Sequence, residues 1–153
     1  MPRFDLVPAT EAHALELLSN ISLQSSDDYA SLGLDPREHA VEHLRKSVCT
    51  FAGLIDGRCF CLFGVLPDAL TANSGEPWLL TSAYLRHAKV AFAKASQQYI
   101  PYLRHRFTFL HGWVYEHNTT SIRWLRWLGY VVGDTTLPAK NGQRYYRFEW
   151  NAR

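Results

Sequence analysis

The sequence predicts an α/β (α+β) fold in which a mixed central sheet of about seven strands carries helices on both faces. Seven segments of strand length are apolar or alternate between apolar and polar residues, and four segments with helical spacing lie between them. The dipeptides Asp56-Gly57 and Asn141-Gly142 are strong hairpin signals. The 153 residues are 47% hydrophobic and 20% charged, which indicates one soluble globular domain over residues 1–153.

The first half of the chain is expected to form three strands and two helices. Thr10 is a good cap for a helix over 11–21, and Asp35 followed by Pro36 predicts the start of a helix over 36–47. The segment 22–34 is polar and rich in turn residues, which predicts a loop or short irregular helices. The expected strands are 3–7, 48–54 and 58–66.

The second half is expected to form four strands and two helices. A turn-rich loop over 67–76 precedes its first strand. Helical spacing then runs from Ser82 to Leu103, and Pro101 should kink or divide this helix. The expected strands are 77–81, 107–115, 130–137 and 144–150.

The second helix of this half carries a recognisable motif. Asn118 is a good N-cap, Gly129 stops the helix, and Trp124 and Trp127 widen its apolar face. The pattern N-x-x-S-x-x-W-x-x-x-L-G-Y resembles the second half of the GNAT-type N-acetyltransferase fold. The matching positions are Asn118, Ser121, Trp124, Leu128, Gly129 and Tyr130.

A narrower resemblance covers residues 76–132. The run P-W-L-L-T-S before a helix, followed by W-V and N-x-x-x-I-R-W-L-R-W-L-G-Y, is similar to short GNAT-like phage and prophage proteins. These proteins are related to the internal virion protein A family of T7-like podoviruses. The resemblance implies a phage-encoded protein that works in the host cytoplasm and meets a host or phage protein.

The GNAT resemblance implies that acetyl-CoA is held where the fourth and fifth strands separate, here near Thr81 and Tyr115. In that fold the pantetheine arm pairs with exposed strand backbone, and the pyrophosphate lies at the N-terminus of the next helix, where free N–H groups favour an anion. The residues that the resemblance places in the cofactor site are Leu80, Thr81, Ser82, Arg86, His87, Lys89 and Asn118. Asn118 also has a simpler interpretation as a helix cap.

The chain departs from the GNAT pattern in two places. The glycine-rich phosphate loop is replaced by residues 82–89, which contain no glycine, so side chains would crowd a pyrophosphate there. Leu125 stands where the family often has a tyrosine that acts as general acid. The remaining candidates for proton transfer near the strand separation are His111, Tyr115 and Glu116, with His111 as the candidate base. A hydrogen-bonded core histidine is the alternative interpretation of His111.

Other patterns predict less. Residues 1–85 carry a net charge of −6 and residues 86–153 a net charge of +8, which suits an anionic cofactor or an acidic partner. His39 and His43 match the spacing H-x-x-E-H, but the sequence supplies no third ligand, so no metal is expected. The cysteines are expected to be reduced, which agrees with a cytoplasmic protein. No segment is long and apolar enough to predict a membrane span.

Two hypotheses follow. The first is an acetyl-CoA-dependent N-acyltransferase that acts on a host protein or a small amine. The second is a GNAT fold without catalysis, which acts by binding a host or phage protein during infection or virion assembly. A nucleic-acid-binding role, suggested by Trp124 and Trp127 beside Arg123 and Arg126, is the weakest, because the sheet requires the apolar face of that helix.

Overall fold

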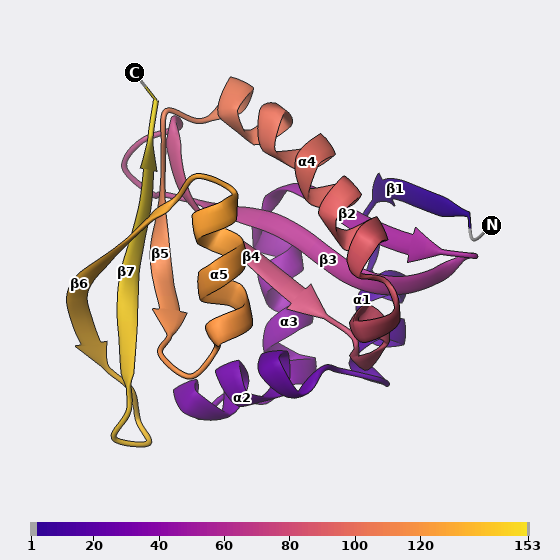
Figure 1. Ribbon diagram of the computed structural model, residues 1–153, viewed down its shortest axis with the longest axis horizontal. Helices are drawn as coiled ribbons and strands as arrows, with labels where there is room; N and C mark the ends of the chain where they lie inside the picture. Colours follow the sequence, from indigo (N-terminus) through magenta and orange to yellow (C-terminus); the bar gives the residue numbers. More distant parts are fainter. Residues whose placement is uncertain (1–2, 153) are drawn as a thin grey trace.

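The computed structural model describes residues 3–152, so residues 1–2 and 153 of the predicted domain lie outside the described residues. It confirms the predicted fold class. A seven-stranded mixed sheet has the strand order β1-β2-β3-β4-β5-β7-β6 (Figure 1). The strands are β1 (Phe4–Pro8), β2 (Val48–Ile55), β3 (Arg58–Pro67), β4 (Ser74–Thr81), β5 (Phe109–Tyr115), β6 (Val131–Pro138) and β7 (Arg144–Asn151).

Helices cover both faces of the sheet. One face carries α1 (Glu11–Leu18), α2 (Leu23–Leu32) and α3 (Pro36–Lys46), and the other carries α4 (Lys89–Arg106) and α5 (Thr119–Trp127) (Figure 1). The core under α1 and α3 is small and includes Ala14, Leu17, Ala40, Leu62 and Leu80. The core under α4 and α5 is larger and rich in aromatic side chains, including Phe63, Tyr99, Phe107 and Phe148. No helix in residues 3–152 is long and apolar enough to cross a membrane.

Local signals explain most of the elements. Asp56 and Gly57 have φ angles of 48° and 78°, so the β2–β3 hairpin uses the left-handed turn that Asp-Gly favours. Thr10, Asp35 and Asn118 cap their helices as predicted, since each side chain accepts a hydrogen bond from a backbone N–H in the first turn.

Four expectations about the elements were wrong. Residues 22–34, expected to be irregular, form the regular helix α2, because Ser22 caps its start and Gly33, at φ 68°, ends it. β4 begins at Ser74 inside the expected loop, where it pairs with β5. Ser82 caps a short 3₁₀ helix, η1 (Ala83–His87), ahead of α4, and Pro101 lies within α4 without dividing it. Trp127, expected on the apolar face of α5, is 54% exposed.

β4 and β5 separate along most of their length. These parallel strands pair only at Ser74 with Phe109 and at Gly75 with Leu110. Beyond these pairs the two strands diverge toward their C-terminal ends, and α5 lies over the gap on one face (Figure 1). The expected separation near Thr81 and Tyr115 is therefore present.

Candidate functional site

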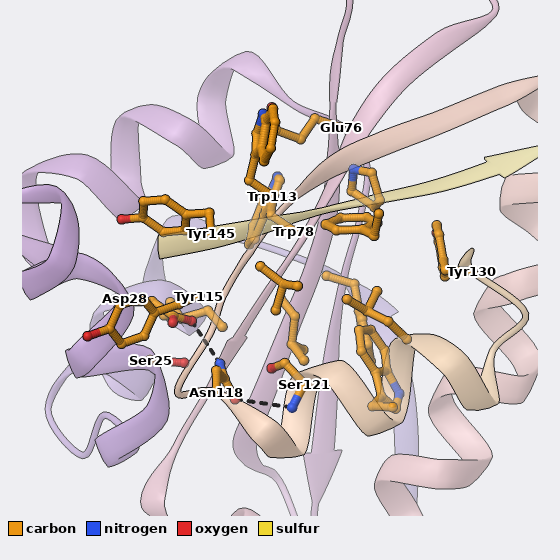
Figure 2. A pocket seen from close by; sticks show the side chains of 18 of the residues that line it. Ser25, Asp28, Glu76, Trp78, Trp113, Tyr115, Asn118, Ser121, Tyr130 and Tyr145 are labelled. Carbon is orange, nitrogen blue, oxygen red and sulfur yellow. Dashed lines mark hydrogen bonds between the residues drawn. The ribbon is translucent and has the colours of Figure 1, made fainter. Parts of the chain in front are cut away.

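The gap between β4 and β5 holds a cavity that reaches both faces of the sheet. This central cavity has a volume of about 220 Å³. On the α4–α5 face it is lined by residues such as Tyr99, Leu125 and Phe148, and on the opposite face by Tyr29, Trp78, Trp113, Tyr115 and Tyr145. Figure 2 shows several of these aromatic side chains gathered around the gap.

A second cavity lies at the C-terminal end of β4. This end cavity has a volume of about 370 Å³, and its walls come from β4, η1 and the starts of α2, α4 and α5. The sequence-predicted cofactor residues among its lining are Thr81, Ser82, Arg86, Lys89 and Asn118. His87 does not line it; this exposed residue accepts a hydrogen bond from Arg86 Nε at 3.1 Å. The end cavity thus brings together most of the predicted cofactor residues.

The backbone around η1 offers few free donors. The N–H groups of Ser82 and Ala83 donate to the carbonyls of Phe60 and Asn20. The N–H of Tyr84 donates to Ser82 Oγ, and that of Leu85 donates to the Ser82 carbonyl. The following helix differs, because no side chain caps the start of α4, an 18-residue helix. Its N-terminus, next to the exposed Arg86 and Lys89, therefore remains the most favourable place for an anion.

The outer edge of β4 is partly occupied. Ser22 N donates to the Thr81 carbonyl at 2.9 Å, and Thr81 N donates to Ser25 Oγ at 3.1 Å. The backbone N–H and C=O groups of successive residues in an antiparallel strand point alternately to its two sides. Those of Leu79 therefore point to the gap, as those of Thr81 do, and those of Leu80 point to β3. Leu80, predicted in the cofactor site, directs only its side chain to the central cavity, and Leu79 is the residue whose backbone N–H and C=O face the gap.

Asp28 and Asn118 lie where the two cavities meet. Asn118 Oδ1 accepts from Ser121 N at 3.1 Å, and its Nδ2 donates to Asp28 Oδ2 at 3.1 Å (Figure 2). The other carboxylate oxygen of Asp28, Oδ1, is shielded from water and has no hydrogen-bond partner in the part of the chain that the structure describes. Burial raises the pKa of Asp28 to about 7, and the charge of Asp27 adds to this rise, whereas the hydrogen bond from Asn118 opposes it.

Burial shifts the pKa values of two ionisable groups beside the aromatic wall of the central cavity, His43 and Glu76. Burial lowers the pKa of His43 to about 4, so its ring is uncharged at neutral pH. His39 and His43 pack edge to face against Tyr29 and Trp78, with the two histidine rings 5.2 Å apart. Burial also raises the pKa of the Glu76 carboxyl, which the charges of His111 and Arg147 partly offset.

The three residues predicted to be catalytic are not brought together. His111 Nε2 contacts Asp68 Oδ2 at 2.8 Å, near the paired start of β5, and it lines neither cavity. Glu116 is bound to Arg144 through the backbone N–H and Nε, and it also lies outside both cavities. Tyr115 lines the central cavity, where its hydroxyl accepts from Asn141 Nδ2 at 2.9 Å. The placement of His111 and Glu116 favours structural roles for both.

Comparisons with known proteins identify the fold. No protein-family model and no curated protein matches the chain. Among solved structures, Ard1 from Thermoplasma volcanium aligns over 98% of both chains with a TM-score of 0.76 at 10% identity. A GCN5-related N-acetyltransferase from Kribbella flavida aligns over 97% of both chains, with a TM-score of 0.72 at 16% identity. The protein has the GNAT-type N-acetyltransferase fold. Identities this low show the fold alone.

A third solved structure contains acetyl-CoA. A putative acetyltransferase from Salmonella typhimurium, solved with its cofactor acetyl-CoA, aligns over 98% of this chain and 94% of that one, with a TM-score of 0.67 at 13% identity. Three features of this chain suit the anionic and amide parts of such a molecule. The uncapped start of α4 and the side chains of Arg86 and Lys89 suit the anionic part, and the backbone N–H and C=O of Leu79 suit the amides. The filled edge at Thr81 limits the strand backbone available to it.

Two residues of the candidate site were not predicted from the sequence. Asp28 lies on α2, which was expected to be irregular, and Leu79 was passed over in favour of its neighbour Leu80. A signal for Asp28 was present: Ser22 followed by Ser25 is typical of a helix start, and helical spacing from Ser25 puts Asp28 and Leu32 on the same face. All three residues line the central cavity.

Proposed function

We propose that this protein is an acyl-CoA-dependent N-acyltransferase. The observation that supports this proposal is the junction between the two cavities. Both are lined by Ser25, Asp28, Leu79, Asn118, Ser121 and Trp124. The end cavity leads to basic side chains and a helix N-terminus, which suit phosphates, and the central cavity leads to an aromatic wall, which suits an organic acceptor.

The chain's own residues divide the work of holding acetyl-CoA. Arg86 and Lys89 would bind its phosphates, with the start of α4 contributing its dipole. The N–H and C=O of Leu79 would pair with the amide groups of the pantetheine arm. When bound, acetyl-CoA supplies an electrophilic thioester carbonyl. The apolar surroundings of the gap, including Trp124 and Leu125, exclude water from it.

Calorimetric titration with acetyl-CoA tests the proposal. The double variant R86A/K89A should bind acetyl-CoA about tenfold more weakly, because it loses two exposed phosphate contacts of about 0.5–1 kcal/mol each. The same variant should bind acetylpantetheine, which carries no phosphates, as tightly as the unaltered protein does. The matched control is K94A, since Lys94 is an exposed lysine of α4 that lines neither cavity. An unaltered protein that takes up no acetyl-CoA at millimolar concentration would refute the proposal.

The structure also favours a second function, that of a non-catalytic binding protein. The N–H groups from Ser82 to Leu85 are already used within the chain, and Leu125 has no proton to give. A GNAT fold with these features would act by binding a host or phage protein, as the phage resemblance of residues 76–132 implies. Absence of acetyl-CoA binding, with the protein shown to be folded by circular dichroism, would favour this function over the first.

A further inference from the structure

Asp28 is a shielded acid without a cationic partner among residues 3–152. Its Oδ1 has no hydrogen-bond partner, and its Oδ2 is bound only by the neutral amide of Asn118. No lysine, arginine or histidine forms an ion pair with Asp28 within residues 3–152. The neighbouring carboxyl of Asp27 has the same sign and increases the cost of ionising Asp28. A positive charge brought by a ligand would relieve that cost.

No lysine or arginine of residues 3–152 lines the central cavity. The titratable side chains that face it are Tyr29 and Asp28 from α2, His39 and His43 from α3, Glu76 from β4, Tyr99 from α4, Tyr115 from β5, Tyr130, and Tyr145 from β7. Burial raises the pKa of Tyr29 to about 12, so this phenol stays neutral, and His43 is neutral as well. Aromatic rings attract organic cations, and Trp78 and Tyr115 line the cavity. Trp113 lies beside them with the guanidinium carbon of Arg147 5.3 Å from its ring centroid.

We infer that the central cavity binds a primary amine on an apolar or aromatic body, and that Asp28 Oδ1 holds its ammonium group and takes its proton. This inference rests on the proposed function, whose acceptor it identifies by chemical class. It makes Asp28 a catalytic residue, because the carboxylate touches the reacting nitrogen.

The position of Asp28 agrees with this role. Asp28 is one of the residues that line both cavities, so an amine held there lies beside the end cavity while its organic body extends toward the aromatic wall. Asn118 fixes the carboxylate from the other side, since its amide is itself held by the backbone of Ser121. Oδ1 is the carboxylate oxygen that no group of residues 3–152 engages.

The proton step is simple. One N–H bond of the ammonium breaks, its electron pair stays on nitrogen, and an O–H bond forms at Asp28. The product is a neutral amine, which is the nucleophilic form. A pKa of about 7 suits the exchange, because Asp28 is partly ionised at neutral pH and can both take up and release a proton.

Binding of phenethylamine to the protein without acetyl-CoA tests the inference. Calorimetry at pH 8 should show binding of phenethylamine and weaker binding, by about tenfold or more, of its neutral counterpart 2-phenylethanol. D28N should lose about tenfold or more in phenethylamine affinity and should no longer distinguish the two compounds. In the unaltered protein the affinity should fall as the pH is lowered from 8 to 5.5, because Asp28 becomes protonated; in D28N it should not change.

D27N is the matched control, because Asp27 is an exposed carboxyl on the same helix that lines neither cavity. D27N should bind phenethylamine as the unaltered protein does. Equal phenethylamine binding by folded D28N, or equal binding of 2-phenylethanol and phenethylamine, would overturn the inference. Acetyl-CoA binding is measured separately. If the protein binds acetyl-CoA but not phenethylamine, the inference is refuted and the proposed function stands. If it binds phenethylamine but not acetyl-CoA, the proposed function is refuted and the amine site stands.

Discussion

Asn118 Nδ2 donates to Asp28 Oδ2 at 3.1 Å, which joins the start of α5 to α2 across 90 residues of sequence. The contact gives one side chain two tasks, because Asn118 Oδ1 also caps α5 through Ser121 N. The helix-cap interpretation of Asn118 is therefore confirmed. Its proposed place at the cofactor remains a prediction, and its contact with the acid at the cavity junction is a third role that local sequence could not suggest.

The two tasks of Asn118 can be separated by substitution. N118S keeps a side-chain oxygen that can cap α5 but loses the donor to Asp28, whereas N118A loses both. N118A should lower the free energy of unfolding by about 1–2 kcal/mol, and N118S by less. Both should raise the pKa of Asp28, because the hydrogen bond from Asn118 lowers it. Urea unfolding and carboxyl NMR titration measure the two effects, with T120A as the exposed control; an unchanged Asp28 pKa in N118S would contradict this account.

Asp28 should make stability depend on pH. Its pKa is about 7 in the folded protein against an ordinary value of 3.8, so the folded state binds this proton more tightly than the unfolded state does. The free energy of unfolding should therefore fall as the pH rises from about 4 through 7, as the carboxyl loses that proton.

D28N removes the ionisation. It should be more stable than the unaltered protein by about 1–3 kcal/mol at pH 8 and nearly equal to it at pH 4, while losing amine affinity. Thermal or urea unfolding at both pH values measures this, and D134N, at an exposed aspartate of β6, is the control. A difference between D28N and the unaltered protein that is the same at pH 4 and pH 8 would count against a raised pKa.

The hydroxyl cluster at the end of β4 should stabilise the protein. Thr81 Oγ1 lies 2.6 Å from Ser22 Oγ and 3.2 Å from Ser25 Oγ, and all three residues are buried. T81V has nearly the same shape but leaves the serine hydroxyls without this partner, so the free energy of unfolding should fall by about 1–3 kcal/mol. T136V, at an exposed threonine of β6, is the control. A urea midpoint for T81V equal to that of T136V would refute the importance of the cluster.

Local patterns were enough for the fold but not for the site. Alternation along β5 correctly put His111, Trp113 and Tyr115 on one face, because side-chain direction in a strand depends only on residue parity. It could not say where along β5 the pairing with β4 ends. That point, just after Leu110, decides that Trp113 and Tyr115 line the cavity and His111 does not.

The missed site residues depend on contacts between distant segments. Asp28 looks like a surface acid in sequence, and only the docking of α2 against the start of α5 shields it. The edge of β4 at Thr81 looks free in sequence, and only the pairing with Ser22 occupies it. Such contacts join segments 59 and 90 residues apart, so neither hydrophobic period nor turn chemistry predicts them.

The position of Trp78 in the cavity wall should depend on Gly64. Gly64 pairs with Trp78 across β3 and β4, and a Cβ at residue 64 would overlap the indole ring, whose Nε1 donates to Ser47 Oγ at 2.8 Å. G64A should therefore displace the ring, lower the free energy of unfolding by about 1–3 kcal/mol, and weaken phenethylamine binding. G133A is the matched control in β6, since a Cβ there would find its nearest heavy atom at 3.9 Å, and its stability should change by less than about 0.5 kcal/mol. Urea unfolding followed by tryptophan fluorescence measures both variants, and equal midpoints would show that the indole has room to move.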